Sequence, residues 1–166
     1  TSMGMTPLEG LVMGSRCGDI DPAIPFHMMN VAGLGADEIE RILNKKSGVL
    51  GITEQYVDRR DIEQAAERGE EQARLAMEAE AYRIRKYIGS YVAALGHVDA
   101  IVFTAGVGEN DAVFRELCCQ DLEPLGIAMD LTKNRTWDKK ANAALHADGS
   151  RVKIFVIRTN EELETS

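Results

Sequence analysis

The chain has 166 residues, of which 45% are hydrophobic, 28% charged and 5% aromatic. These proportions indicate a globular protein of roughly one domain and exclude collagen, a low-complexity tail and a disulfide-stapled miniprotein. The 27 acidic residues exceed the 19 basic ones, so the formal net charge is -8. Nucleic acid and anionic membranes are therefore poor partners. A small anion can still bind, because local donors override the bulk field within about 8–10 Å.

Cysteine usage and hydropathy indicate the compartment. The three cysteines, two of them adjacent, are too few for a disulfide framework, which favours reduced thiols in the cytoplasm. No apolar run approaches the roughly 20 residues of a membrane helix, and no basic and apolar leader opens the chain. The start, Thr1-Ser2-Met3-Gly4, has neither an initiator methionine nor a helix or strand pattern. We therefore expect the chain to be part of a longer polypeptide.

The first half is predicted to be helical after an irregular start. Residues 1–30 are rich in Gly, Pro and Met with broken periodicity, which predicts a tightly turning connection. A helix is predicted from Asp37, with acidic residues in its first turn and lysines near its end before Gly48, as the helix dipole favours. Its apolar face is formed by Ile39, Ile42 and Leu43.

Two more helices are predicted, over residues 60–68 and 69–95, with Gly96 as the stop of the second. The expected apolar face of this long helix consists of Leu75, Ala79, Tyr82, Tyr87, Tyr91 and Leu95.

The second half predicts strands alternating with helices, which is typical of an α/β layered domain. Residues 99–104 are β-branched and aromatic, which predicts a buried strand, and residues 152–157 predict a second one. A helix is expected over residues 111–122, and residues 132–150 are expected to be an exposed, variable segment. The apolar side of that helix would carry Val113, Phe114, Leu117 and Cys118.

A strand, glycine turn and helix at residues 104–110 is the strongest signal for chemistry. Glycines at 106 and 108 let backbone amides approach a ligand, and a following helix start adds positive partial charge. These features favour a nucleotide phosphate or sugar. The alternative is a tight turn without a ligand, since the pattern matches neither the dinucleotide fingerprint nor the P-loop.

A second signal is Arg16, set between glycines and followed by Asp19 and Asp21. A fixed guanidinium fork suits phosphoryl or carboxylate oxygens. Alternatively, Asp19 caps a helix that begins near Pro22, and Arg16 pairs with Asp19.

A third signal for chemistry is a pair of carboxylates after the strand predicted over residues 152–157. Glu161 and Glu162 follow Asn160 there and could hold Mg²⁺ directly or through water, or they could simply open a helix.

Other polar motifs are interpreted as structural. Residues 44–48 predict a helix end with a glycine cap. The three histidines, His27, His97 and His146, are expected at the surface or in packing roles. No His and Cys set has zinc spacing, so Cys17, Cys118 and Cys119 are interpreted as buried or half-buried thiols.

Four segments, taken together, resemble the second half of acetate kinases in order and spacing. They are TSMGMTPLEGLVMGSRCGDIDPAI, NKKSGVLGITEQYVDRRDIE, IVFTAGVGENDAVFRE and FVIRTNEEL. The likeness covers nearly the whole chain and is weakest between residues 126 and 151. Because four ordered motifs are far more specific than one glycine loop, the sequence is identified as a member of the acetate, propionate and butyrate kinase family.

The resemblance implies an α/β fold, the C-terminal part of an actin, Hsp70 and sugar-kinase-like domain of the ribonuclease H-like type. Residues 1–166 would be the C-terminal nucleotide-binding domain, incomplete because its opening strands and final helix are missing. The implied reaction is reversible transfer of a phosphoryl group from ATP to acetate, giving acetyl phosphate and ADP, with Mg²⁺ as cofactor. The family's first domain supplies the acetate pocket, so the isolated chain is expected to be inactive.

The family's functional residues match positions in this chain. Arg16 matches the transition-state arginine, and Glu161 matches the magnesium-associated glutamate. The nucleotide contacts match Asp58, Arg59, Arg60, Gly106, Val107, Gly108, Glu109 and Asn110. Two positions depart from the pattern: Arg59 stands where relatives often have an aromatic residue, and Arg158 where they usually have proline.

Alternatives to an acetate kinase fragment stay open. One is a non-catalytic nucleotide-binding or assembly module derived from such a kinase, and another is a propionate or butyrate kinase. Family members pair through the second domain, which implies a homodimer to which the helix over residues 69–95 could contribute. A cytoplasmic location is expected, without a nucleic-acid or membrane partner.

Overall fold

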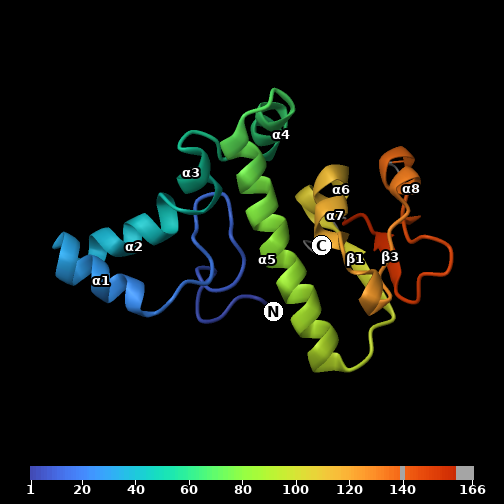
Figure 1. Cartoon of the computed structure of the whole chain (residues 1–166), viewed down its shortest axis with the longest axis horizontal. Coiled ribbons are helices and arrows are strands. Elements are labelled where there is room, and N and C mark those ends of the chain that lie inside the picture. The colour runs from blue at the N-terminus through green and yellow to red at the C-terminus, as the bar shows by residue number, and fades with distance from the viewer. Residues whose placement is uncertain (139–140, 160–166) are drawn as a thin grey trace, which may run out of the picture. The chain divides into compact units, whose positions relative to one another are not determined.

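The computed structural model describes residues 1–138 and 141–159 (Figure 1). Its chain separates into two compact units, Thr1–Ile84 and Arg85–Ser166. The sequence predicts a single domain over residues 1–166, and that assignment stays a prediction.

The first unit is helical. It contains α1 (Ala23–Ala32), α2 (Ala36–Lys45), α3 (Gly48–Thr53), α4 (Arg59–Glu67) and the first part of α5 (Glu71–Leu95). In α2 the acidic residues lie in the first turn and Lys45 in the last, as predicted from the dipole. The prediction that residues 1–30 form an irregular connection is wrong for their last part, because α1 begins at Ala23. No residue of α1 is buried, and its apolar residues are spread around the helix, so no single apolar face marks this helix in the sequence.

The long helix α5 is confirmed, but its predicted apolar face is wrong. Tyr82 and Leu95 are 57% and 69% exposed. The buried residues of α5 are mostly small, namely Ala73, Ala76, Met77 and Ala81. Alanine lets neighbouring segments approach a helix closely, whereas the pattern argument gave most weight to large side chains.

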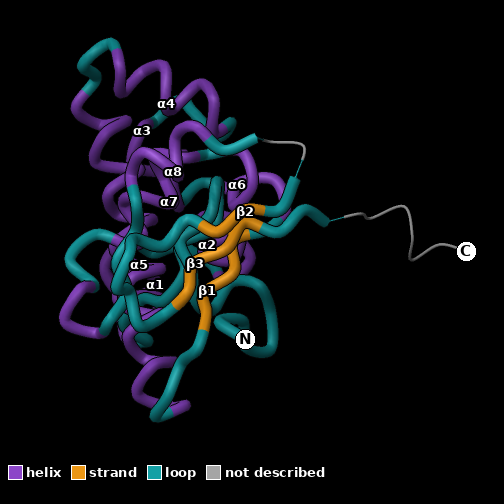
Figure 2. The backbone as a smooth tube through the Cα atoms, turned by 90° about the vertical axis from the view of Figure 1, so that its right-hand side faces the viewer, coloured by secondary structure: helices purple, strands orange, loops and turns teal. Residues whose placement is uncertain are grey.

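The second unit contains a three-stranded sheet in the order β1-β3-β2, and Figure 2 shows the strands side by side. Strands β1 (Ala100–Phe103) and β3 (Lys153–Val156) are parallel, and β2 (Ala143–Ala144) is antiparallel to β3. Both predicted strands are confirmed. The prediction that the first strand is buried is wrong. Among the described residues β1 has a strand neighbour on one side only, and its Val102 is 48% exposed.

Helices α6 (Ala105–Asn110), α7 (Ala112–Cys119) and α8 (Leu131–Thr136) and the short 3-10 helix η1 (Glu123–Leu125) complete this unit. Its core consists of Cys119, Leu122, Ile127, Leu145, Val152, Ile154 and Val156, against which Ile88 and Val92 of α5 pack.

Two expectations for the helices and the connecting segment of this unit need correction. In α7, Phe114 and Cys118 are buried as expected, but Val113 is 48% exposed. Residues 132–150 are not simply an exposed segment, because Asn134 and Leu145 are fully buried. Leu145 joins the core beside β3, to which the two-residue strand β2 pairs. Such a short strand leaves no alternating pattern in the sequence.

Candidate functional site

The loop that carries Arg16 is bonded along its backbone to the junction of α2 and α3. Four N–H···O bonds of 2.8–3.0 Å make this connection. They run from Cys17 to Leu43, from Ser47 to Ser15, from Val49 to Met13 and from Leu50 to Gly14. Because backbone bonds at successive residues leave little freedom, the path of the loop around Arg16 is fixed.

Gly48 lets this junction approach the Arg16 loop. It has φ +62°, and a Cβ placed on it would lie 2.0 Å from the carbonyl oxygen of Met13 and 2.6 Å from that of Arg16. The prediction of a glycine-capped helix end is therefore wrong. Helix α2 ends at Lys45 with Lys46 as its C-cap residue, and Gly48 begins α3. The glycine is required by close approach and left-handed backbone.

The Arg16 guanidinium is half-buried and contacts Sδ of Met13 at 3.7 Å. Among the described residues of the first unit, no carboxylate is bonded to it. The alternative pairing with Asp19 is wrong, because Asp19 pairs with Arg83 at 3.0 Å and accepts the Gly10 N–H at 2.7 Å.

Asp19 is also not the cap of the helix that follows. The Ala23 N–H at the start of α1 donates to Oδ1 of Asp21 at 2.8 Å. Asp19 instead anchors the Arg16 loop to α5 through Arg83.

Asp58, Arg59 and Arg60 begin α4 in the same unit. Asp58 is the N-cap residue and accepts the Arg60 N–H at 2.9 Å. Hydrogen bonding from the Arg60 side chain lowers the pKa of Asp58. The Arg59 guanidinium pairs with Glu80 of α5, and both side chains are largely buried. Arg60, in contrast, is 84% exposed.

Two predicted site segments of the first unit are neighbours. A Cβ placed on Gly14 would lie 3.0 Å from Cγ1 of Val57. Gly14 precedes Arg16 by two positions and Val57 directly precedes Asp58. The structure therefore brings the Arg16 loop next to the start of α4.

In the second unit, the predicted glycine turn is itself a short helix. Gly106 and Gly108 lie within α6, whereas the sequence predicts a helix only from residue 111. Space around Gly106 is open, since a Cβ there would have no atom within 4 Å, whereas one on Gly108 would lie 3.2 Å from the carbonyl carbon of Phe103. Ala105 at the start of α6 has φ 57°, a strained conformation for a residue with a side chain.

Glu109 joins α6 to the end of β3. Its Oε1 accepts the Ala105 N–H at 3.0 Å, the Thr159 N–H at 2.8 Å and the Thr159 hydroxyl at 2.9 Å. Arg158 donates its N–H to Oδ1 of Asn142 at 2.9 Å, a bond that a proline at this position could not make. Glu161 lies outside the described residues, but Thr159, two positions earlier, is held against α6.

Replacing Glu109 with glutamine is expected to abolish a pH dependence of this connection. Hydrogen bonds from Thr159 lower the pKa of Glu109 below its usual value of 4.5. A lowered folded pKa means that the stabilisation is complete above pH 4.5 and is lost as the pH falls through the folded value. The NMR shift of the Thr159 amide proton should therefore titrate in acid in the wild type and stay flat in Glu109→Gln.

Glu123→Gln is the control, because Glu123 is an exposed carboxylate in the same unit. Its Thr159 signal should titrate as in the wild type. An unchanged titration in Glu109→Gln would show that another group holds Thr159.

Sequence reasoning missed the buried polar pair Arg115 and Asn134, which are 1% and 0% exposed. An arginine within an amphipathic helix usually lies at the surface. No signal in the sequence distinguishes this one, since its partners come from other helices.

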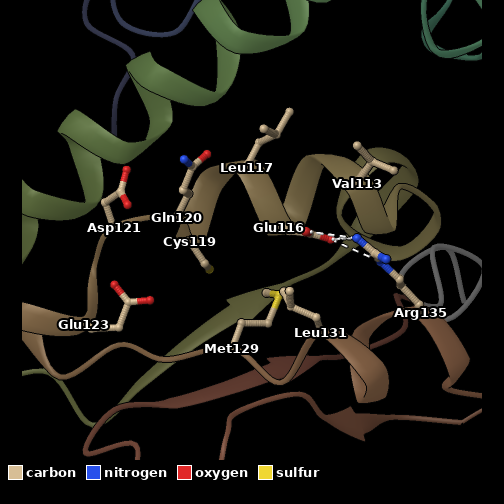
Figure 3. A pocket seen from close by; sticks show the side chains of 10 residues that line it. All are labelled: Val113, Glu116, Leu117, Cys119, Gln120, Asp121, Glu123, Met129, Leu131 and Arg135. Carbon is tan, nitrogen blue, oxygen red and sulfur yellow. Dashed lines mark hydrogen bonds and ion pairs between the residues drawn. The ribbon is translucent and has the colours of Figure 1, made fainter. Parts of the chain in front are cut away.

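A hollow of about 310 Å³ lies beside α7 and α8 (Figure 3). Its apolar lining includes Val113, Leu117, Met129 and Leu131, and the ion pair of Glu116 with Arg135, at 2.8 Å, borders it. None of the predicted site residues that the structure describes lines this hollow. Asp121 and Glu123 also line it, and their charges disfavour a polyphosphate. The hollow is therefore a separate feature from the predicted nucleotide segments.

Two features are absent from the part of the chain that the structure describes. Within residues 1–138 and 141–159, no three His, Cys, Asp or Glu side chains gather to hold a metal ion. In the same ranges no helix has both the length and the apolar character to span a bilayer. The three cysteines all lie within the described residues and form no disulfide, and Cys118 and Cys119 are buried as expected. Burial raises the pKa of Cys119 to about 12.

Both the sequence and the fold of the chain are similar to those of known proteins. The model of the acetokinase family matches residues 1–165. The acetate kinase of Geobacter metallireducens is 54% identical over 164 residues, which are 98% of this chain and 39% of that protein. The acetate kinase of Porphyromonas gingivalis has a crystal structure that superposes with a TM-score of 0.91 at 46% identity, covering 97% of this chain and 40% of that one.

A crystal structure of a propionate kinase from Francisella tularensis superposes with a TM-score of 0.88 at 41% identity, covering 98% of this chain and 41% of that one. The chain thus spans about 40% of the length of the relatives that it matches. These likenesses confirm the predicted fold class, a mixed α/β fold that is part of a sugar-kinase-like domain.

Proposed function

The chain belongs to the acetokinase family, and we propose on this premise that it is the C-terminal nucleotide-binding part of a phosphotransferase. The proposed enzyme transfers a phosphoryl group reversibly between ATP and acetate, giving acetyl phosphate and ADP. A relative named acetate kinase, 54% identical to this chain, supports acetate as the acceptor. Propionate is the second candidate, supported by the propionate kinase at 41% identity.

The presentation of Arg16 is the observation that carries this proposal. Phosphoryl transfer passes through a state with charge spread over three oxygens, which needs donors fixed in advance. The loop of Arg16 is held by four backbone bonds, and within its unit no described carboxylate is bonded to the guanidinium. A planar guanidinium on a fixed loop suits the oxygens of a phosphoryl group better than an ammonium does.

Nucleotide binding is assigned to Gly106, Val107, Gly108, Glu109 and Asn110, together with Asp58 and Arg60. Arg59 is reassigned within this proposal. Its guanidinium is engaged by Glu80, so we give it the role of holding α4 on α5. Arg60, which is exposed, is the better candidate for contact with the adenosine part.

Gly106→Ala is expected to change nucleotide affinity and stability in opposite directions. The methyl group would enter open space and favour the helical backbone, raising the free energy of unfolding by about 0.5–1 kcal/mol. If the backbone amides of this segment approach phosphate, the same methyl group should weaken ADP binding about tenfold. This factor corresponds to the loss of roughly one hydrogen bond to a charged group. Urea unfolding and calorimetric titration with ADP measure the two effects.

Gly89→Ala in α5 is the matched control, because a Cβ there also has no atom within 4 Å. It should raise stability similarly and leave ADP binding unchanged. Equal ADP affinity in both variants would remove α6 from the nucleotide site.

Mg²⁺ is proposed as the cofactor, with Glu161 as its protein ligand. The described residues contain no cage of three ligating side chains, and Mg²⁺ ordinarily binds one or two carboxylates together with substrate phosphates. A single carboxylate, which in the sequence comes five positions after the last residue of β3, fits that pattern. When bound, the ion would neutralise charge on the phosphates.

A chimera tests the proposed activity. In it, residues 1–166 replace the matched 39% of Geobacter metallireducens acetate kinase. We expect the chimera to form acetyl phosphate from ATP and acetate, and the isolated chain to show negligible turnover, since the relatives extend well beyond it. A folded chimera without activity that still binds ADP would favour the alternative, a non-catalytic nucleotide-binding or assembly module.

We also propose a cytoplasmic homodimer. The compartment is supported by the three cysteines, which lie within the described residues and form no disulfide. Exposed apolar side chains on α5, including Leu75 at 49% and Tyr82 at 57%, support self-association through this helix. A monomeric mass of the chimera by sedimentation would contradict the dimer.

A further inference from the structure

Arg115 in α7 is a charged side chain inside the second unit, with 1% of its surface exposed. Within the described residues its guanidinium makes four hydrogen bonds, all to carbonyl oxygens. Nη1 donates to Gly108 at 2.8 Å and to Glu109 at 3.1 Å, and Nε and Nη2 donate to the side chain and backbone of Asn134 at 2.8 and 3.2 Å. Burial lowers the pKa of Arg115, but a guanidinium stays protonated in proteins.

Asn134 fixes the other side of this guanidinium. It is fully buried in α8, and its Nδ2 donates to the Ala112 carbonyl at the start of α7 at 2.8 Å. The ring of Trp137 lies 5.8 Å from the guanidinium carbon. The fork of Arg115 therefore joins three helices, α6, α7 and α8, through hydrogen bonds from each of its three nitrogens.

Simple core packing does not explain this arrangement. Burying a charge is expensive unless every donor is bonded, and an apolar side chain of similar volume would fill the space without that cost. The two bonds to Gly108 and Glu109 reach the last turn of α6, where carbonyls lack partners and carry negative partial charge. A cation at this place holds that end of the helix.

Helix α6 needs such support. A helix of six residues is unstable by itself in water, and its first residue, Ala105, has the strained φ of 57°. Glu109 bonds the Ala105 N–H at one end, and Arg115 bonds the carbonyls at the other. The direction of the amides in residues 106–110 therefore depends on these contacts.

We propose that Arg115, held by Asn134, is a positioning residue that fixes α6 and thereby the direction in which residues 106–110 face a nucleotide. The nucleotide part of this inference rests on the proposed function. The fixing of α6 rests on the hydrogen bonds alone.

Arg115→Lys tests the inference, because an ammonium keeps the charge but cannot reach both α6 and Asn134 with a rigid fork. In the 166-residue chain, hydrogen exchange of the amides of residues 108–110, which follow the first turn of α6, where amides lack backbone partners in the helix, should become about tenfold faster, while residues 154–156 of β3 exchange as before. In the chimera, the KM for ATP should rise about tenfold with the KM for acetate unchanged. A purely structural role predicts loss of stability without this split between the two KM values.

Two further variants keep the test decisive. Asn134→Leu removes the side-chain acceptor of Arg115 while keeping the number of heavy atoms, and it should loosen α6 in the same way, even if Arg115→Lys unfolds the chain. Arg135→Lys is the matched control. Arg135 lies in α8, is 61% exposed and pairs with Glu116, so exchange and KM should stay at wild-type values.

The inference is overturned if Arg115→Lys and Asn134→Leu leave exchange of residues 108–110 within about twofold of the wild type. A second outcome also overturns it. In that outcome Arg115→Lys loosens α6 but has the same KM for ATP as Arg135→Lys, whereas Gly106→Ala raises the KM for ATP. If neither Gly106→Ala nor Arg115→Lys changes the KM for ATP, the nucleotide assignment of α6 itself fails, and the positioning role fails with it.

Discussion

The chimera carrying Arg16→Ala is expected to turn over about 10³-fold more slowly than the parent chimera, with little change in the KM for ATP. A donor that acts on the charge of the transferring phosphoryl group stabilises the transition state more than the bound substrate. Its loss therefore lowers kcat and kcat/KM together. Steady-state kinetics of acetyl phosphate formation measure this directly.

Stability should be nearly unaffected in the same variant. Among the described residues of its unit, the one polar contact of the guanidinium is with Sδ of Met13, so its removal breaks no ion pair there. Arg16→Lys should recover little activity, because an ammonium lacks the fork. The control is Arg41→Ala, an exposed arginine of α2 that pairs with Glu38, and its kcat should match the parent. Activity of Arg16→Ala within a few-fold of that control would remove Arg16 from the chemistry.

Gly48→Ala is expected to have the second largest effect, because it distorts the loop that presents Arg16. An alanine at φ +62° would place its Cβ 2.0 Å from a backbone oxygen. The left-handed backbone alone costs about 1–3 kcal/mol, and the oxygen must also move. Urea unfolding of the 166-residue chain should show the loss of stability, and the chimera should lose most of its kcat.

Gly35→Ala provides the comparison. Gly35 precedes α2 with φ -75°, and a Cβ there would have no atom within 4 Å. It should leave both stability and kcat close to the parent values. If Gly48→Ala were equally harmless, the close packing of the α2–α3 junction against the Arg16 loop would be wrong.

Helices α2, α4 and α5 and both longer strands could be predicted from the sequence, because periodic apolar residues and charged ends mark them. Helix α1 could not, since its apolar residues do not gather on one face. The exposed aromatic residues of α5 misled the choice of its packed side, where alanines are buried instead. Pattern arguments weigh side-chain size, whereas packing of helices also rewards small residues.

In the candidate site, the glycine patterns identified the segments around Arg16 and Gly108, whose functional roles stay predictions. What the sequence could not reveal is how each segment is supported. Gly48 is explained by the backbone of residues distant in sequence, and Arg115 by carbonyls of α6 and α8. Such contacts depend on tertiary structure, and no local pattern encodes them.

The central claim is that Arg16, the amides of residues 106–110 and Glu161 act on one polyphosphate. A crystal structure of the chimera with Mg²⁺ and a non-hydrolysable ATP analogue tests it most directly. The account predicts the Arg16 fork at the γ-phosphate oxygens, the α6 amides against the same nucleotide and Glu161 beside the metal ion. An analogue bound elsewhere, with these three groups on separate surfaces, would contradict it.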